Sequence, residues 1–347
     1  MPDIPARQAL KYALMRGALD LIAFSGARRV YPSAAGRGVI FTLHHVRPAR
    51  GSAYDPNALL SVTPEFLAVA IEASLEAGYV PVAVEDLPKL LAEPCDKRRF
   101  VSFTLDDGYR NNGEYAAPVF RKYRVPYTIF ITAGFVERTR SLWWETAALL
   151  TANEDCLTFD FGAGPETLET KTVAQKRAAY DRFAAFIQTA DEDMAVARLD
   201  ELAERSGIDP LGITAELTMD ARELRELAKD PLVRFGAHTL THVNLRRVGG
   251  PRLEEELQLS AEAVEGYVGR YPSAFAYPYG FAAAVGEREI EAAARAGFAI
   301  AVTTQPGVLG PDTLNRPTGV GRVSLNGHFQ KKRYVDSLLS GLAFKLI

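Results

Sequence analysis

Short apolar runs alternate with longer amphipathic segments along most of this chain. The apolar runs are rich in β-branched and aromatic residues, a pattern typical of strands buried in a sheet. They cover residues 38–46, 79–84, 100–105, 127–132, 232–237, 273–277, 298–303 and 320–325. The helical patterns between them cover residues 64–77, 113–123, 220–229, 251–268 and 286–296. Strands that alternate with helices indicate a parallel sheet, and we predict an α/β fold, a distorted (β/α) barrel of about seven strands.

This alternation breaks between about residues 141 and 218. Trp143 and Trp144 begin this section, and two long helical patterns follow them, near residues 170–189 and 194–206. We interpret the section as a helical insertion between barrel strands. The predicted organisation is then an N-terminal helical segment at 1–35, the barrel with its insertion at 36–325, and a C-terminal amphipathic tail at 326–347.

The composition is that of an ordinary soluble globular enzyme, with 48% hydrophobic and 24% charged residues. A net charge of −3 gives no electrostatic basis for binding nucleic acid. Cys95 and Cys156 lie far apart and suggest no disulfide framework. The sequence gives no indication of the oligomeric state.

Residues 8–25 are moderately apolar but are interrupted by Lys11, Arg16 and Asp20. The apolar region of a secretion signal is an unbroken run of about 7–15 residues, so we expect an amphipathic helix and not an export signal. This helix either packs on the barrel or lies on a membrane surface. The basic, apolar tail at 330–347 leaves the same two alternatives. We expect a cytoplasmic protein with a possible peripheral contact to the inner membrane.

Two adjacent carboxylates, Asp106 and Asp107, follow the apolar run at 100–105, and Gly108 allows the backbone to turn after them. Burying two like charges this close is costly unless a cation or a proton separates them. Asp-Asp-Gly is also a common turn sequence, so this stretch alone does not establish a site.

A second stretch, residues 233–245, has the same build of an apolar run followed by polar ligands. It contains His238 and His242, two of the five histidines of the chain. In a helical turn, residues four apart lie on one face, so both imidazoles can bind one ion. One aspartate and two histidines, with positions left open for water and substrate, are a usual set for a catalytic divalent metal.

The candidate residues share one position in the predicted fold. His44, Asp106, Asp107, His238 and Tyr279 each lie just beyond the C-terminal end of an expected strand. The loops at that end of a (β/α) barrel converge on one mouth, where the active sites of such barrels lie.

Three short motifs resemble those of the polysaccharide deacetylase family. TLDDG (104–108) and HTLTH (238–242) are similar to the first two motifs, and FAYPYG (275–280) is similar to the third. The resemblance covers roughly residues 36–325. It implies a metal-dependent hydrolase that removes N-acetyl groups from an amino sugar in a polysaccharide, oligosaccharide or lipid-linked glycan. Zn²⁺ is the metal we expect, although Co²⁺, Ni²⁺ and Fe²⁺ suit the same ligands.

The resemblance also implies a division of roles. Asp107, His238 and His242 hold the metal, Asp106 is the general base, and the backbone N–H of Tyr279 helps to form the oxyanion hole. Candidate substrate contacts are Tyr279, Trp143, Trp144 and Leu245. Tryptophan rings can stack on the apolar faces of sugars, but packing in the core is the alternative for at least one of these two.

The sequence departs from the common family pattern in two places. The third motif usually begins with an arginine that steadies the base; Arg322, on the last expected strand, could replace it or could be a surface residue. The late Leu-x-His motif that supplies the general acid is absent. A first strand ending in histidine resembles the rearranged poly-N-acetylglucosamine deacetylases, which implies His44 as the acid. The competitors are His45, expected to pack locally, and His328, expected to be silent.

Two other functions remain open. The same fold and metal could hydrolyse another non-peptide C–N bond, or the chain could be a catalytically silent carbohydrate-binding protein. The presence of both aspartates and both histidines of the motifs counts against silence.

Overall fold

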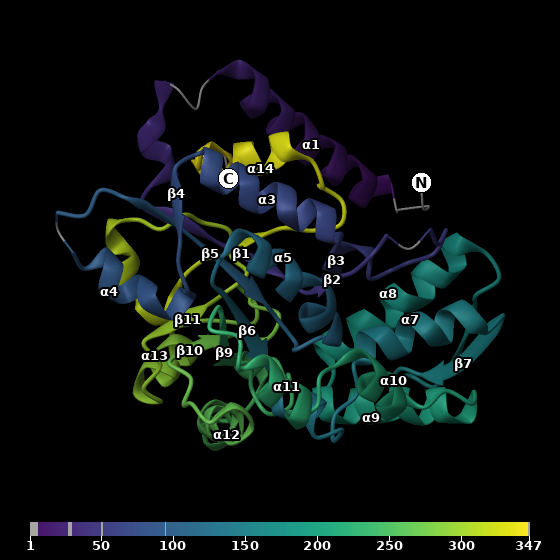
Figure 1. The fold of residues 1–347 in the computed structure, drawn as a ribbon. Coiled ribbons are helices and arrows are strands. Elements are labelled where there is room, and N and C mark those ends of the chain that lie inside the picture. Colours follow the sequence, from purple (N-terminus) through teal and green to yellow (C-terminus); the bar gives the residue numbers. More distant parts are fainter. Residues whose placement is uncertain (1–5, 27–29, 50, 94, 346–347) are drawn as a thin grey trace.

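A curved, parallel eight-stranded sheet occupies the centre of the computed structural model, which describes residues 6–26, 30–49, 51–93 and 95–345 (Figure 1). Seven strands follow the order β11-β10-β9-β6-β5-β1-β12, and β4 pairs with β5 outside this path. The strands are β1 (Gly38–Leu43), β4 (Tyr79–Pro81), β5 (Arg99–Leu105), β6 (Tyr127–Ile131), β9 (Val233–Ala237), β10 (Ala274–Ala276), β11 (Ile300–Val302) and β12 (Val323–Ser324).

The two ends of the sheet approach each other. An isolated parallel bridge joins Val302 of β11 to Val320, which lies just before β12. Central strands are buried on both faces, as shown by β1 and β6, in which every residue is buried. This explains their continuous apolar runs, and the predicted distorted (β/α) barrel is confirmed.

Helices cover the outside of the sheet (Figure 1). Thr63 caps the first helix after β1 by accepting a hydrogen bond from the Phe66 N–H, and Pro64 occupies the first helical position. The helices of the barrel are α3 (Pro64–Glu76), α4 (Leu87–Leu91), α5 (Ala117–Tyr123), α6 (Ala133–Val136), α11 (Ala221–Leu227), α12 (Gly250–Val268) and α13 (Glu287–Arg295). Of these, α3, α5, α11, α12 and α13 lie where the sequence pattern indicated, whereas the short α4 and α6 were not predicted.

The predicted strand at 38–46 is interrupted at His44. Strand β1 ends at Leu43, and β2 (His45–Val46) pairs with β3 (Ser61–Val62) in a separate small sheet. The break matters for the site, because His44 lies at the point where the chain leaves the main sheet.

The insertion contains more elements than the two predicted helices. It consists of α7 (Trp143–Asn153), β7 (Cys156–Asp160), β8 (Pro165–Glu169), α8 (Val173–Thr189), α9 (Glu192–Arg205) and α10 (Pro210–Leu217). The antiparallel hairpin of β7 and β8 was not predicted. These elements pack around their own cluster of buried side chains, which includes Phe183, Ile187 and Leu199.

The N-terminal helix α1 (Ala6–Ser25) packs on α14 (Lys332–Leu339) of the tail. Leu19 lies in a small cluster with Phe329 and Tyr334, and the Ser337 hydroxyl donates to the Leu19 carbonyl. The parts of the predicted terminal segments at 1–5, 27–29 and 346–347 lie outside the described residues.

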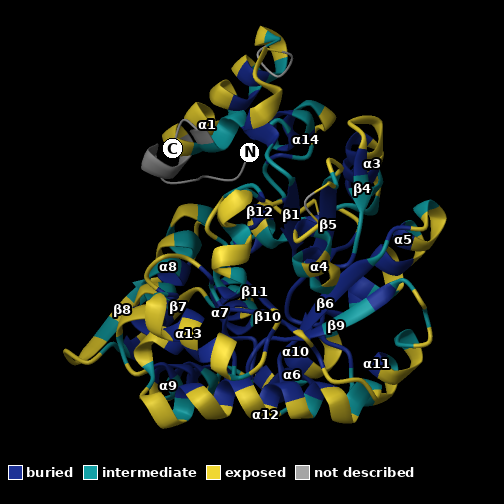
Figure 2. Cartoon of the chain, turned by 90° about the vertical axis from the view of Figure 1, so that its left-hand side faces the viewer, coloured by how far each residue is buried: buried dark blue, intermediate teal, exposed yellow. Residues whose placement is uncertain are grey.

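The opposite face of α1 is apolar and exposed (Figure 2). Leu10, Leu14, Leu21 and Phe24 are between 61% and 78% exposed. Within the described part of the chain, no helix has the length and hydrophobicity needed to cross a membrane.

Candidate active site

Neighbouring strands bring the two motifs together because their backbone ladders continue one residue past the strand ends. The Asp106 N–H donates to the Leu43 carbonyl at 3.0 Å, which joins the end of β5 to the end of β1. The His238 N–H donates to the Ile131 carbonyl at 2.9 Å, which joins the end of β9 to the end of β6. These bonds fix the register of the strand ends, so that the two aspartates and His238 lie at the same edge of the sheet.

Asp107, His238 and His242 are buried, and their ligand atoms lie within 4.8 Å of one another. Oδ1 of Asp107 is 3.5 Å from Nε2 of His238 and 3.4 Å from Nε2 of His242. Two ligands at bond lengths of about 2.1 Å in a tetrahedral zinc site are separated by about 3.4 Å. The spacing therefore fits a single zinc-sized ion.

The hydrogen bonds of His238 leave the correct nitrogen free for a metal. Its Nδ1 lies 2.6 Å from the Ala276 carbonyl oxygen, which can only accept, so Nδ1 carries the proton. Nε2 then presents a lone pair toward Asp107, as in metal sites whose histidines donate the other N–H to a carbonyl. Oδ1 of Asp107 is itself buried without a hydrogen-bond partner. Lone pairs that face one another in this way need a proton or a metal cation between them.

The pKa values of Asp107 and His238 are shifted by the charged groups that lie close to them. Burial raises the pKa of the Asp107 carboxyl, but His238 and His242 more than offset this and lower it well below its ordinary value. Burial lowers the pKa of His238, but Asp107 and Asp106 outweigh burial and raise it. The cluster thus favours a positive charge at its centre, which a divalent ion can supply.

The backbone around the cluster adopts conformations that are unfavourable for residues with side chains. Among the described non-glycine residues, six have positive φ, and four of these belong to the motifs: Asp107, Thr239, His242 and Tyr279. The Thr239 hydroxyl supports one of them by accepting the His242 N–H at 2.9 Å. Such residues cost on the order of 1–3 kcal/mol each and concentrate at functional sites.

Asp106 lies beside the cluster and is held by Arg322. Nη1 and Nη2 of Arg322 donate to the two oxygens of Asp106, each at 2.7 Å. Arg322 is fully buried and also donates to the Thr303 carbonyl, which excludes the surface alternative. Burial raises the pKa of the Asp106 carboxyl, but the positive charge and hydrogen bonds of Arg322 outweigh burial, so the pKa lies below its ordinary value. Asp106 is therefore ionised at neutral pH, as a proton acceptor must be.

His44 faces the same carboxylate from the end of β1. Its Nε2 lies 4.0 Å from Oδ2 of Asp106, and its side chain is 24% exposed. The Asn112 side chain donates to the His44 carbonyl at 2.7 Å and fixes the backbone there. Burial lowers the pKa of His44, while Asp107 and Asp106 act in the opposite direction.

The other two histidines are engaged elsewhere. His45 is completely buried, with Nδ1 2.7 Å from the Asn111 amide nitrogen and its ring 3.6 Å from that of Tyr109. His328 packs against the ring of Tyr12 in α1, with ring centroids 4.7 Å apart. The structure thus brings His44 alone, of the three competitors, to Asp106.

The candidate substrate contacts are mostly buried. Trp143 and Trp144 are 6% and 7% exposed, and their indole N–H groups donate to the hydroxyls of Tyr279 and Tyr109. Leu245 is 1% exposed and belongs to the main core. Stacking on a sugar needs an accessible ring face, so these positions favour the packing alternative for both tryptophans and argue against direct substrate contact by Leu245. Tyr279 is the one of these four residues that is partly exposed.

One residue of the site was not anticipated. Glu192, at the start of α9 in the insertion, is 6% exposed and accepts a hydrogen bond from the Tyr279 hydroxyl at 2.6 Å. In the sequence it stands between Asp191 and Asp193, where acidic residues are common simply because they favour the N-terminus of a helix. No sequence signal distinguished it from these two neighbouring aspartates.

The sequence model of the family described as Polysaccharide deacetylase matches residues 93–301. No curated protein sequence gives a significant match. Among solved structures, the chain is similar to the Streptococcus pyogenes deacetylase PplD in complex with acetate, at 16% identity and a TM-score of 0.53, over 84% of this chain and 92% of that one. BC0361, a polysaccharide deacetylase from Bacillus cereus, is 17% identical, with a TM-score of 0.53 over 87% and 68% of the two chains.

IcaB from Ammonifex degensii is 16% identical, with a TM-score of 0.50 over 87% of this chain and 97% of that one. At these identities the likeness to solved structures shows the fold. The family match covers more than half of the 347 residues and contains all three motifs, while His44 and Arg322 lie outside it. On this match, the chain belongs to the polysaccharide deacetylase family.

Proposed function

We propose that this protein is a metal-dependent hydrolase that removes N-acetyl groups from an amino sugar in a polysaccharide, oligosaccharide or lipid-linked glycan. The observation that carries the proposal is the buried cluster of Asp107, His238 and His242 with the ionised Asp106 beside it. The metal we propose is Zn²⁺, because the ligand set and its spacing suit that ion. Co²⁺, Ni²⁺ and Fe²⁺ are chemically compatible alternatives.

A metal held by these three side chains would polarise the acetyl carbonyl and make a bound water more acidic. The protein supplies the remaining steps. Asp106 accepts the proton of the attacking water, and Arg322 keeps both carboxylate oxygens oriented for this. The Tyr279 N–H donates to the oxygen that gains negative charge. His44 gives a proton to the departing amine, since its Nε2 lies 4.0 Å from Oδ2 of Asp106 and neither His45 nor His328 reaches that carboxylate.

The position of His44 also bears on the kind of glycan. In the poly-N-acetylglucosamine deacetylases with a rearranged active site, the acid comes from the first strand, and β1 ends directly before His44 here. We therefore propose a polymer or oligomer of N-acetylglucosamine as the substrate class.

We further propose that α1 places the enzyme at a membrane surface. The supporting observations are the exposed apolar face of Leu10, Leu14, Leu21 and Phe24 and the exposed Lys11 on the same helix. An amphipathic helix of this kind lies in the plane of the interface and prefers anionic lipids. The cytoplasmic location expected from the sequence stays a prediction.

Metal binding and base catalysis should separate on substitution. Asp107→Asn, His238→Ala and His242→Ala should each lose most bound metal and most acetate release from N-acetylglucosamine oligomers, whereas Asp106→Asn should lose the activity by about 10²–10⁴-fold and keep the metal. Elemental analysis and acetate assays of the purified variants measure both properties. An Asp106→Asn protein without metal would refute this division. A wild-type protein that binds the oligomers and releases no acetate would favour the silent binding alternative.

The general acid can be identified by kcat and its pH profile. His44→Ala should lower kcat by about 10²–10⁴-fold at unchanged metal content. Because burial lowers the pKa of His44 below 6.5, the protonated form is lost as pH rises through that lower value, and kcat/KM should decline on this alkaline side. The decline should vanish in His44→Ala.

His328→Ala and His45→Ala are the matched controls for His44→Ala. The first should be nearly silent, and the second should reduce mainly the thermal stability, because His45 is buried and hydrogen-bonded. Full turnover by His44→Ala together with a crippled His328→Ala would show that the acid has been assigned to the wrong histidine.

Membrane contact can be tested by co-sedimentation with vesicles that contain anionic lipid. The wild-type protein should pellet with the vesicles. The double variant Leu14→Glu/Leu21→Glu should reduce binding by at least about tenfold, because each leucine that becomes buried in the membrane contributes roughly 1.5–3 kcal/mol to the binding free energy. Leu259→Glu is the control, since Leu259 is an exposed leucine on α12. Wild-type protein that stays in the supernatant would exclude the proposed contact.

A further inference from the structure

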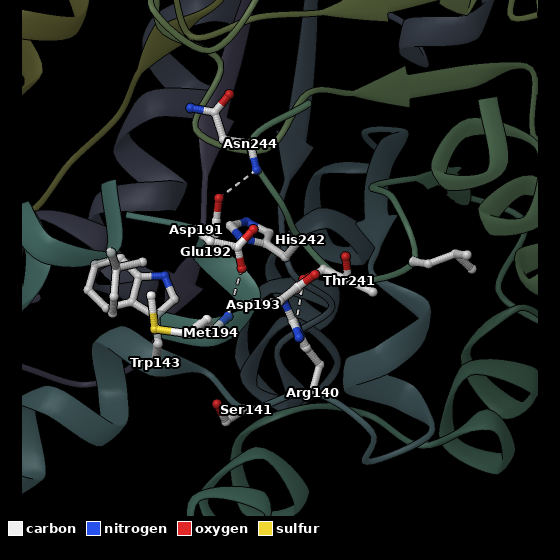
Figure 3. Close-up of polar contacts among 12 residues, drawn as sticks. Arg140, Ser141, Trp143, Asp191, Glu192, Asp193, Met194, Thr241, His242 and Asn244 are labelled. Carbon is white, nitrogen blue, oxygen red and sulfur yellow. Dashed lines mark hydrogen bonds and ion pairs between the residues drawn. The ribbon is translucent and has the colours of Figure 1, made fainter. Parts of the chain in front are cut away.

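The first turn of α9 carries a carboxylate from the insertion into the active site (Figure 3). Oε1 of Glu192 accepts the Tyr279 hydroxyl at 2.6 Å, and Oε2 accepts the Asn244 N–H at 2.9 Å. Nη1 of Arg247 lies 3.7 Å from the same carboxylate. Glu192 therefore joins the third motif to the loop that follows His242, although it belongs to neither.

Tyr279 needs external support because its backbone is strained. Its φ of 62° is unfavourable for an aromatic residue, and the peptide is held by the Thr304 hydroxyl, which donates to the Tyr279 carbonyl at 2.7 Å. The hydroxyl end of the side chain is held by two residues of the insertion, since the Trp143 indole donates to the Tyr279 hydroxyl at 3.1 Å and Glu192 accepts from it. The carbonyl and the hydroxyl of Tyr279 are thus both held, which restricts the rotations that direct its N–H.

The insertion is itself fastened to the loop of the second motif, so Glu192 has a fixed position relative to the metal ligands. Asp193 forms ion pairs with Arg140 and Arg252. Arg140, which points toward Asp193 in Figure 3, also donates to the Thr241 carbonyl at 3.2 Å. On the barrel side, Glu256 accepts the Thr241 N–H at 3.0 Å. The two contacts to Thr241 hold the residue directly before His242.

We propose that Glu192 is a positioning residue for deacetylation, which aligns the Tyr279 N–H with the acetyl carbonyl by holding the Tyr279 hydroxyl. The inference rests on the proposed function, because it assumes that this N–H stabilises the oxyanion. It gives the insertion a direct part in the chemistry: the barrel supplies the metal site and the base, and the insertion fixes the geometry of the oxyanion hole.

The test compares Glu192→Ala, Glu192→Gln and Tyr279→Phe with the exposed control Glu201→Gln on the same helix. Glu192→Ala and Tyr279→Phe should each lower kcat by about 10- to 100-fold, as misplacement of a catalytic group does, with little change in KM or metal content. Glu192→Gln should recover part of the rate, because its amide oxygen can still accept the tyrosine bond although its NH2 group cannot accept from the Asn244 N–H. Glu201→Gln should behave as wild type.

The double variant Glu192→Ala/Tyr279→Phe should be no slower than the slower single variant, because both changes remove the same hydrogen bond. Independent, multiplying effects would overturn the proposal, as would wild-type kcat in Tyr279→Phe, a change that leaves the bonds from Glu192 to Asn244 and Arg247 in place. A loss of kcat that follows a loss of metal or of folded protein would show a purely structural role, and would overturn it too.

If the protein is not a deacetylase, the wild-type assay shows it separately from the variants of Glu192 and Tyr279. A wild-type protein that carries metal and releases no acetate refutes the deacetylase proposal whatever the variants do. The crystal structure of Glu192→Ala then decides the positioning role by itself: a displaced Tyr279 peptide is expected, and an unchanged peptide with φ near 62° contradicts it.

Discussion

Two adjacent carboxylates are buried together at the end of β5, and the rest of the active site depends on keeping their charges apart. An uncompensated buried ion costs on the order of several kcal/mol, so neither Asp106 nor Asp107 can be left alone. The chain gives each a different partner. Asp106 is paired with a permanent cation, Arg322, whereas Asp107 faces two imidazoles that could hold a metal ion together with it. The proposed roles, Asp106 as the base and Asp107 as a metal ligand, follow from these partners.

Parallel strands make this separation of charge possible. The ends of β1, β5, β6 and β9 lie side by side, so residues distant in sequence meet at one edge, and Arg322 reaches Asp106 from the segment before β12. The left-handed backbone at Asp107, His242 and Tyr279 then turns these residues into a common space. The surrounding hydrogen bonds offset the strain, as those of Thr239 and Thr304 illustrate.

Much of the fold could be predicted because buried parallel strands leave continuous apolar runs, and Asp-Asp-Gly and His-x-x-x-His follow two of them. The choice between a buried and a surface Arg322 could not be made, since its partner lies 216 residues away and nothing in the local sequence marks it. The hairpin of β7 and β8 was missed because each strand has only five residues, in a section dominated by helical patterns. Trp143 and Glu192 depend on how the insertion docks on the barrel, which local patterns do not encode.

The central claim is that Asp107, His238 and His242 hold one divalent ion between them. Anomalous X-ray scattering from a crystal of the purified protein, measured above and below the zinc absorption edge, tests it most directly. We expect a single strong peak within bonding distance, about 2.0–2.2 Å, of Oδ1 of Asp107 and Nε2 of both histidines. Zinc-supplemented crystals with no peak there, or with a peak bound to Asp106 in place of Asp107, would contradict it.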